Sequence, residues 1–461
     1  SNMFEENIGK NNENIFPEKD DLAKIVKFIK GNMKCDFYTK KLRLNTETFY
    51  DHLIYKSCRL NLKDYYGLTV LRRWQSFTPA LSTGSEVGQK GGGYFVYKTD
   101  EKGEIEEGLV VDPGFNFLEN FFDEGFSIRD IDAILMTHSH RDHSSDFMSI
   151  ITLVHEMNKR GKRVFSEGRW KDKKLVLFMT DGCYQNFAEQ INVSRDAFCD
   201  IIRVKRGSEY PNPNEKNTFL CKFNLEIKKA NHNDLTDYDS VGYVIKDANG
   251  KHLIGFTGDT QWFNGIEKEY EKCPIVCMNI GGVVDIFKEN VLLSDLAEDT
   301  EHNKIKNIFI KENHLYLPGF YLMAQKLKQG RELKLLIISE LCEEMKGGLR
   351  SDLAKRISEN LKIPVLPEDI GLTVILDRRK KGNVFCKICQ LEHPPDKIKA
   401  VETDKNNAMV YLCDYHYNKL KEDYSLPKIN ELELDLNELR KPFIKKDSTG
   451  ITSCLKKIIG K

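Results

Sequence analysis

Short apolar runs alternate with stretches of helical spacing along most of this chain. The runs indicate buried strands and lie at residues 68–74, 91–97, 131–136, 175–179, 275–278 and 335–338. Helical spacing recurs at residues 147–157 and 349–361. The alternation continues to residue 376 and predicts an α/β domain in which helices cover the outer faces of packed sheets.

The two ends of the chain follow other patterns. Residues 20–30 have helical apolar spacing, which predicts an α-rich extension that could cap the main domain, bind a partner or form a homodimer. Residues 429–439 are acidic and amphipathic, and a basic tail follows them. We therefore expect four parts, at residues 1–66 (extension), 67–380 (main domain), 381–425 (small module) and 426–461 (tail).

Three histidines and an aspartate lie within six residues, directly after the predicted strand at 131–136. They are His138, His140, Asp142 and His143. Imidazole and carboxylate groups suit borderline divalent metals such as Zn²⁺, and a turn after a strand can direct all four side chains into one cavity. The sequence therefore predicts a metal site, with a histidine-rich surface turn as the alternative.

Three more candidate ligands follow later strands. His232 comes after the apolar-polar alternation at 223–227, Asp259 ends an apolar strand in the string Thr-Gly-Asp-Thr, and His314 follows an apolar run at 308–310. A single histidine is more often a surface or core residue than a metal ligand, so these three candidates depend on the cluster at 138–143.

The HxHxDH string at 138–143 resembles the ligand motif of the metallo-β-lactamase family, and the resemblance extends from about residue 68 to residue 376. It implies an αββα sandwich whose ligands lie on loops at one edge. The fold expected for the whole chain is thus α/β, an αββα metallo-β-lactamase sandwich with an α-rich N-terminal extension and a small C-terminal zinc-binding module.

The resemblance also implies a role for each candidate. His232, Asp259 and His314 match the third, fourth and fifth family motifs, and Asp112 matches the first, whose aspartate orients the ligand loop. One metal would be held by His138, His140 and His232. The other would be held by Asp142, His143 and His314, with Asp259 bridging the two metals.

A bridging aspartate at position 259 favours the dinuclear hydrolases of the family. The sequence looks most similar to the tRNase Z and phosphodiesterase-like branch, although the histidine-containing HEAT loop and the long arm of that branch are not found. Two divalent metals (Zn²⁺, or Mn²⁺ or Fe²⁺) would leave the site positive, which favours a phosphodiester substrate attacked by a metal-bridging hydroxide. A small-molecule hydrolase acting on a cyclic nucleotide, lactone or thioester, or a partner-activated effector or sensor subunit, are the alternatives.

Glu340 follows the apolar run at 335–338. A carboxylate there could donate a proton or hold a histidine, so it is a further catalytic candidate beside Asp142 and Asp259. The alternative is that Glu340 begins the next helix, where a negative charge is favoured by the helix dipole.

A second metal pattern lies in the small module. Cys386 and Cys389 form a CxxC pair, and Cys413 and His416 form a CxxH pair 23 residues later. These spacings predict one structural Zn²⁺ in a zinc-ribbon or treble-clef-like module of the zinc-finger type, with His393 as another possible fourth ligand. Packing as reduced hydrophobic residues is the alternative.

Charge and composition limit the partners. The chain has 461 residues with 70 basic and 70 acidic side chains, so any RNA or DNA footprint must be local. Residues 378–381, Lys397 and Lys399 could form one, and a solvated linker is the alternative. No apolar run reaches the ~18 residues of a membrane span, and the scattered cysteines indicate reduced thiols, so the expected compartment is the cytoplasm.

Overall fold

A computed structural model describes the chain in segments. These are residues 19–32, 41, 63–75, 91–164, 171–194, 197–211, 220–232, 240–282, 314–342, 345–377, 382–402 and 408–423. The chain divides into two compact units, which are Ser1–Tyr55 and Lys56–Lys461. In the first unit the helix expected at 20–30 is present as α1 (Lys19–Asn32). The predicted tail at 426–461 and the basic residues 378–381 lie outside the described residues.

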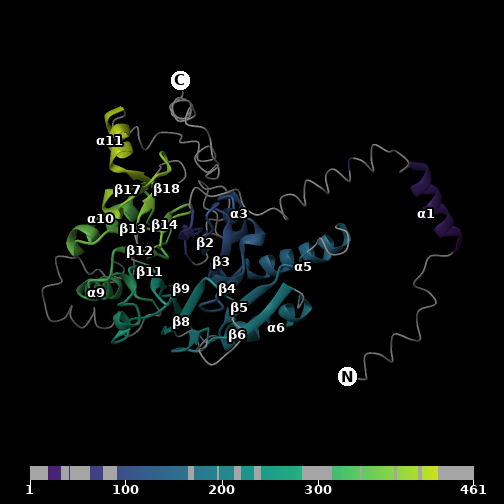
Figure 1. Ribbon diagram of the computed structural model, residues 1–461, viewed down its shortest axis with the longest axis horizontal. Coiled ribbons are helices and arrows are strands. Elements are labelled where there is room, and N and C mark those ends of the chain that lie inside the picture. The colour runs from purple at the N-terminus through teal and green to yellow at the C-terminus, as the bar shows by residue number, and fades with distance from the viewer. Residues whose placement is uncertain are drawn as a thin grey trace. The chain divides into compact units, whose positions relative to one another are not determined.

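The second unit contains two large sheets (Figure 1). The first has nine strands in the order β16-β15-β14-β1-β2-β3-β4-β5-β6. Strands β3 to β6 run parallel to one another, and the other neighbours are antiparallel. Their bounds are Tyr66–Val70 (β1), Tyr94–Thr99 (β2), Ile105–Val111 (β3), Ala133–Leu135 (β4), Leu175–Met179 (β5), Phe198–Arg203 (β6), Thr373–Ile375 (β14), Val384–Phe385 (β15) and Glu392–His393 (β16).

The second sheet has seven strands in the order β13-β12-β11-β10-β9-β8-β7. Strands β10 to β13 are parallel and β7 to β10 are antiparallel. Their bounds are Glu209–Tyr210 (β7), Phe223–Lys229 (β8), Val241–Asp247 (β9), His252–Phe256 (β10), Ile275–Asn279 (β11), Leu335–Ser339 (β12) and Val365–Pro367 (β13). A separate hairpin-like pair consists of β17 (Ile398–Glu402) and β18 (Met409–Cys413).

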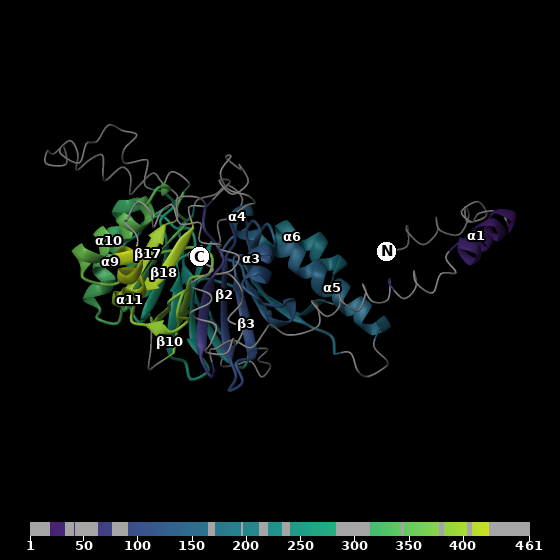
Figure 2. The ribbon, with the colours of Figure 1, turned by 90° about the horizontal axis from the view of Figure 1, so that it is seen from above.

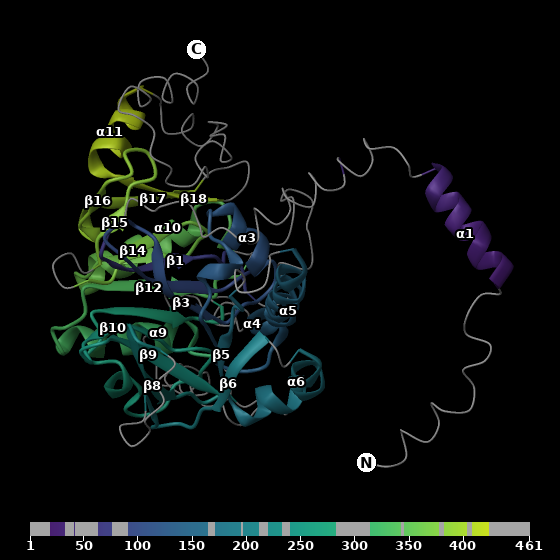
Figure 3. The ribbon, with the colours of Figure 1, turned by 45° about the vertical axis from the view of Figure 1, so that its right-hand side comes forward.

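Helices flank the two sheets on both sides (Figure 2). Beside the first sheet lie α3 (Phe117–Asp123), α5 (Phe147–Val164) and α6 (Asp181–Val193); beside the second lie α9 (Tyr316–Gln329) and α10 (Leu349–Leu361). Short helices are η3 (Ile128–Asp130), α4 (Arg141–Ser144), η5 (Ile266–Glu269) and η8 (Pro395–Lys397), and α11 (Asp414–Asp423) packs with β17 and β18 at one end (Figure 3).

Alternating side chains of the strands build separate apolar layers. Val96 and Tyr243 belong to the core between the sheets, where side chains from both sheets meet. The neighbouring Phe95 points the other way and meets Phe121 of α3 edge to face at 4.9 Å between ring centroids. On the outer face of the second sheet, Met278 packs in one cluster with α9 and α10. The expected αββα arrangement of layers is therefore confirmed.

Two sequence expectations change in detail. The strand predicted at 68–74 ends at Val70, because Arg72 and Arg73 leave the sheet to form buried ion pairs. The cysteine-containing module starts inside the sandwich, because β15 and β16 extend the first sheet. Among the described residues, no helix is long and apolar enough to cross a membrane.

Candidate metal centre

The loop after β4 presents the predicted histidine cluster. Asp112, at the end of β3, fixes this loop: its carboxylate accepts hydrogen bonds from Thr137 N (2.7 Å), Thr137 Oγ1 (2.6 Å) and His143 Nδ1 (2.9 Å). Asp112 has a left-handed backbone with φ of 48°, which an aspartate tolerates better than most residues. Asp112 therefore ties the loop of the histidine cluster to the end of β3 through His143 Nδ1, and Nε2 of His143 remains without a hydrogen bond.

Four of the predicted ligands form one group. The ligand atoms of His138, His140, His232 and Asp259 lie within 4.8 Å of one another. They come from the loop after β4, the end of β8 and the end of β10, all at one edge of the sandwich. Nε2 of His138 is buried and makes no hydrogen bond. An unpaired imidazole nitrogen among three other donors is what a bound cation requires, so this group fits a divalent metal.

A second group contains Asp142, His143 and Glu340, with ligand atoms again within 4.8 Å of one another. Nε2 of His143 is buried and makes no hydrogen bond. Oδ2 of Asp259 lies 3.4 Å from His143 Nε2 and 3.7 Å from His138 Nε2, so it faces both groups. Asn279 Nδ2 donates to the other oxygen of Asp259 at 2.9 Å. This is the placement expected of a bridging carboxylate, and the donor set fits a second divalent metal.

Among the described residues, neither group includes His314. Its Nδ1 lies 3.7 Å from Oδ2 of Asp259, and its ring centroid is 5.2 Å from that of His232. The side chain is 23% exposed, whereas that of His143 is fully buried. His314 is therefore the more exposed of these side chains, and Glu340 is the residue whose ligand atom groups with those of Asp142 and His143.

Burial and neighbouring charges shift the pKa values of residues in both groups. Burial lowers the pKa of His143, but Asp259 and Asp142 outweigh it and raise the pKa to about 10. Burial raises the pKa of Asp259, and the facing histidines His143 and His314 outweigh it and hold the pKa well below its usual range. Burial together with His143 lowers the pKa of His138. The carboxylates of Asp259 and Asp142 therefore favour a positive charge beside them, as the raised pKa of His143 indicates.

Sequence reasoning missed the buried polar side chains behind Glu340. Nη1 of Arg72 pairs with Glu340, and Nη2 of Arg72 donates to the carbonyl oxygen of Asp142. Glu368 accepts hydrogen bonds from Glu340 N at 2.5 Å and from Ser339 Oγ at 2.8 Å, and burial raises its pKa to about 7. The only sequence signal was an arginine pair inside an otherwise apolar strand.

The cysteine pattern closes into one cluster. Cys386, Cys389, Cys413 and His416 have ligand atoms within 4.8 Å of one another. Nδ1 of His416 lies 3.1 Å from Sγ of Cys413, whereas His393 Nε2 lies 3.4 Å from Sγ of Cys389 at the rim. The hydrogen bond between the two thiols lowers the pKa of Cys386 and raises that of Cys389, which favours a thiolate at Cys386.

A buried ionic network joins this module to the sandwich. Asp369 accepts from Arg73 Nε at 2.7 Å, from Arg350 Nη2 at 3.2 Å and from the backbone N–H of Met409, in β18, at 2.7 Å. Arg350 also donates to Glu402 of β17 at 3.1 Å. The module is thereby fixed to the layer that carries Arg72 and Glu368.

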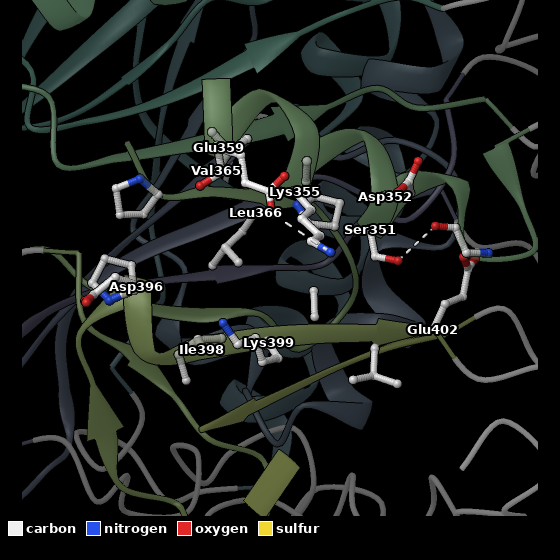
Figure 4. A pocket seen from close by; sticks show the side chains of 18 of the residues that line it. Ser351, Asp352, Lys355, Glu359, Val365, Leu366, Asp396, Ile398, Lys399 and Glu402 are labelled. Carbon is white, nitrogen blue, oxygen red and sulfur yellow. Dashed lines mark hydrogen bonds and ion pairs between the residues drawn. The ribbon is translucent and has the colours of Figure 1, made fainter. Parts of the chain in front are cut away.

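A separate cavity of about 770 Å³ lies between α10, β13 and β17 (Figure 4). Lys355, Glu359, Lys399 and Glu402 line it with both signs of charge, and it contains none of the predicted metal ligands. Lys399 belongs to the basic residues that the sequence suggested for RNA or DNA binding. Its charge is partly neutralised, because its Nζ lies 3.7 Å from Oδ1 of Asp414.

Comparisons with known proteins agree with this architecture. Residues 108–294 match the family model described as the Beta-lactamase superfamily domain, which covers less than half of the chain. No curated protein matches the chain. The matched segment contains the loop of His138 to His143, His232 and Asp259, and it lies within the αββα sandwich. The fold is therefore the metallo-β-lactamase sandwich, α/β in class, as the sequence predicted.

Solved structures with this fold are distant in sequence. The metallo-beta-lactamase fold protein YhfI from Bacillus subtilis is 15% identical, covering 68% of this chain and 100% of its own, with a TM-score of 0.45. Human tRNase Z, short form, is 12% identical over 68% of this chain and 100% of its own, with a TM-score of 0.41. A diphosphatase from the PhnP family is 14% identical with the same coverage and a TM-score of 0.43.

Proposed function

We propose that this protein is a dinuclear metal-dependent hydrolase that cleaves phosphodiester bonds, with RNA or DNA as substrate. The observation that carries the proposal is the position of Asp259, whose Oδ2 faces two groups of buried donors at once. Two metals held a few ångströms apart supply Lewis-acid activation of water and neutralise charge on phosphoryl oxygens. A nuclease or phosphodiesterase uses this arrangement directly.

The residues of this chain have separate roles in the proposed reaction. His138, His140 and His232 would hold one metal, and Asp142 and His143 would hold the other. Asp112 would orient His143 by the hydrogen bond at 2.9 Å. His314 has an Nδ1 without a hydrogen bond and a partly exposed ring, so it can exchange a proton with a group of the substrate at the open side.

The test is hydrolysis of bis-p-nitrophenyl phosphate and of labelled RNA, single-stranded DNA and duplex DNA, with Zn²⁺ or Mn²⁺ added. We expect turnover by the wild type and a loss of at least ~100-fold for Asp142→Ala, because one ligand of a metal is removed. Asp352→Ala, at an exposed position on α10, is the matched control and should keep full activity. Turnover of a lactone or thioester in place of all four substrates would overturn the phosphodiester proposal, and turnover of a cyclic nucleotide in place of the nucleic acids would overturn RNA or DNA as the substrate.

We also propose that Cys386, Cys389, Cys413 and His416 hold one structural Zn²⁺. Four donors without an open position are typical of a zinc that contributes to folding and takes no part in the reaction. Cys413→Ser should remove one zinc per chain and lower the melting temperature, while Cys221→Ser, at an exposed position, should change neither. An unchanged zinc content in Cys413→Ser would contradict this site.

A further inference from the structure

We propose that Glu340, and not His314, completes the protein ligands of the second metal. The two metal positions then differ in chemistry: the first has His138, His140 and His232, whereas the second has Asp142, Glu340 and a single histidine, His143. The inference rests on the two-metal centre of the proposed function. Its consequence is that the second position prefers a harder ion such as Mn²⁺, while the first prefers Zn²⁺.

The backbone fixes where the Glu340 side chain goes. Glu340 directly follows β12 and adopts a left-handed conformation with φ of 62°, which a residue other than glycine adopts only when its surroundings hold it there. Its N–H donates to Glu368 Oε1 at 2.5 Å, and Ser339 Oγ donates to Glu368 Oε2 at 2.8 Å. These hydrogen bonds direct the carboxylate of Glu340 toward the metal centre. Glu340 does not begin the next helix, because α10 starts at Leu349.

The carboxylate of Glu340 has too few partners for its burial. It is 0% exposed, and its Oε2 makes no hydrogen bond. Its Oε1 pairs with Arg72 and lies 3.3 Å from Nε2 of His143. Since Asp142 and Asp259 lie at the same centre, one guanidinium cannot balance the buried negative charge, and a cation beside His143 would do so.

Arg72 links Glu340 to the loop of the other ligands. The guanidinium donates to the carbonyl oxygen of Asp142 and, from Nε, to Gly92 O at 3.0 Å, while it pairs with Glu340. It therefore ties the backbone of Asp142 to the side chain of Glu340. Arg72 also offsets the charge that Glu340 adds, so the centre keeps a positive charge for an anionic substrate.

His314 is placed for a different task. It is 23% exposed, packs its ring against His232 and Tyr316, and belongs to neither donor group among the described residues. Its Nδ1 lies 3.7 Å from Oδ2 of Asp259. A partly exposed imidazole can contact substrate, whereas the second metal needs donors on its buried side, where Glu340 lies.

The experiment compares metal uptake by Glu340→Gln and His314→Ala in the full chain. The protein is stripped of metal and then given one equivalent each of Zn²⁺ and Mn²⁺ for the active centre. Metal content is measured by mass spectrometry, and bound Mn²⁺ by electron paramagnetic resonance. Zinc released by a thiol-specific mercurial reports the cysteine cluster separately, and circular dichroism reports folding.

We expect wild type and His314→Ala to bind Mn²⁺ beside Zn²⁺, and Glu340→Gln to bind Mn²⁺ at least ~10-fold more weakly while it keeps the first zinc. Glu340→His is a second variant, which should shift the second position from Mn²⁺ to Zn²⁺. The inference would be overturned if His314→Ala lost the second metal while Glu340→Gln retained it. It would also be overturned if both positions of the wild type preferred Zn²⁺ over Mn²⁺ equally. Because the readout is metal binding, an absence of phosphodiester hydrolysis would leave these outcomes unchanged.

Discussion

Oδ2 of Asp112 accepts a hydrogen bond from Nδ1 of His143 at 2.9 Å, and this contact sets which nitrogen of His143 faces the metal centre. With Nδ1 occupied as a donor, Nε2 is the nitrogen available to a metal. The same carboxylate holds Thr137 by two further hydrogen bonds, so one residue outside the ligand groups controls both the tautomer of His143 and the path of the ligand loop.

Asp112→Asn should weaken metal binding without removing a ligand. The amide cannot accept all three hydrogen bonds with equal strength, so His143 loses its preferred tautomer and orientation. We expect metal affinity to fall about 10–100-fold, measured by competition with a chromophoric chelator. Asp123→Asn, at an exposed position at the end of α3, is the control and should bind metal as the wild type does. Unchanged affinity in Asp112→Asn would show that the contact does not orient the ligand.

Gly114→Ala should disturb the second metal through packing alone. A Cβ on Gly114 would overlap the carbonyl oxygen of Asp142 and lie 2.8 Å from Gly92 O. We expect a loss of about 1–3 kcal/mol in the free energy of unfolding and weaker metal uptake, measured by urea denaturation and metal content. Gly330→Ala, at the end of α9 with φ of −68°, is the control. Equal behaviour of the two variants would contradict the close packing of this loop.

Asp369→Ala should separate the cysteine module from the sandwich. It leaves Arg73 and Arg350 without their shared carboxylate and Met409 N without its acceptor. Because these groups are buried, we expect a loss of about 3–5 kcal/mol in the free energy of unfolding, seen by urea denaturation with zinc content measured in parallel. Asp352→Ala removes an exposed pair with Arg356 and should leave the stability unchanged. A small effect of Asp369→Ala would mean that the network does not hold the module.

Glu226 provides a pH-dependent contribution to stability. Burial raises its pKa, but hydrogen bonds with His252, Lys228 and Lys246 outweigh burial and hold the pKa well below its usual value. A carboxyl whose pKa is lower in the folded state stabilises the fold above its unfolded pKa of about 4.3, and this stabilisation disappears as the pH falls below it. Lys228 Nζ lies 2.7 Å from Glu226 Oε2.

Glu226→Gln should therefore lower the free energy of unfolding by about 1–2 kcal/mol near neutral pH. The difference should become progressively smaller as the pH falls below about 4. Urea denaturation of both proteins across this range gives the difference directly. Glu209→Gln on the adjacent strand, with an exposed side chain, is the control. A difference that stayed constant with pH would show that the charge of Glu226 does not contribute.

The local part of the metal centre was determined by the sequence. His138, His140, Asp142 and His143 are close in the chain and follow a strand, so their meeting needs only a turn. The spacing of the cysteine pattern likewise predicts a cluster that the structure brings together. The apolar runs predicted the layers of the sandwich, because burial of a strand on both faces leaves a continuous apolar run in the sequence.

Only the tertiary structure decided which residue joins Asp142 and His143. The family resemblance favoured His314, but the distance along the chain carries no information about which strand end lies on the buried side of the metal centre. Glu340 reaches that side because Arg72 and Glu368, far apart in sequence, hold its carboxylate and its backbone. Buried ion pairs of this kind form between segments that are distant in the sequence. The periodicity of apolar residues in one segment therefore does not predict which residues pair.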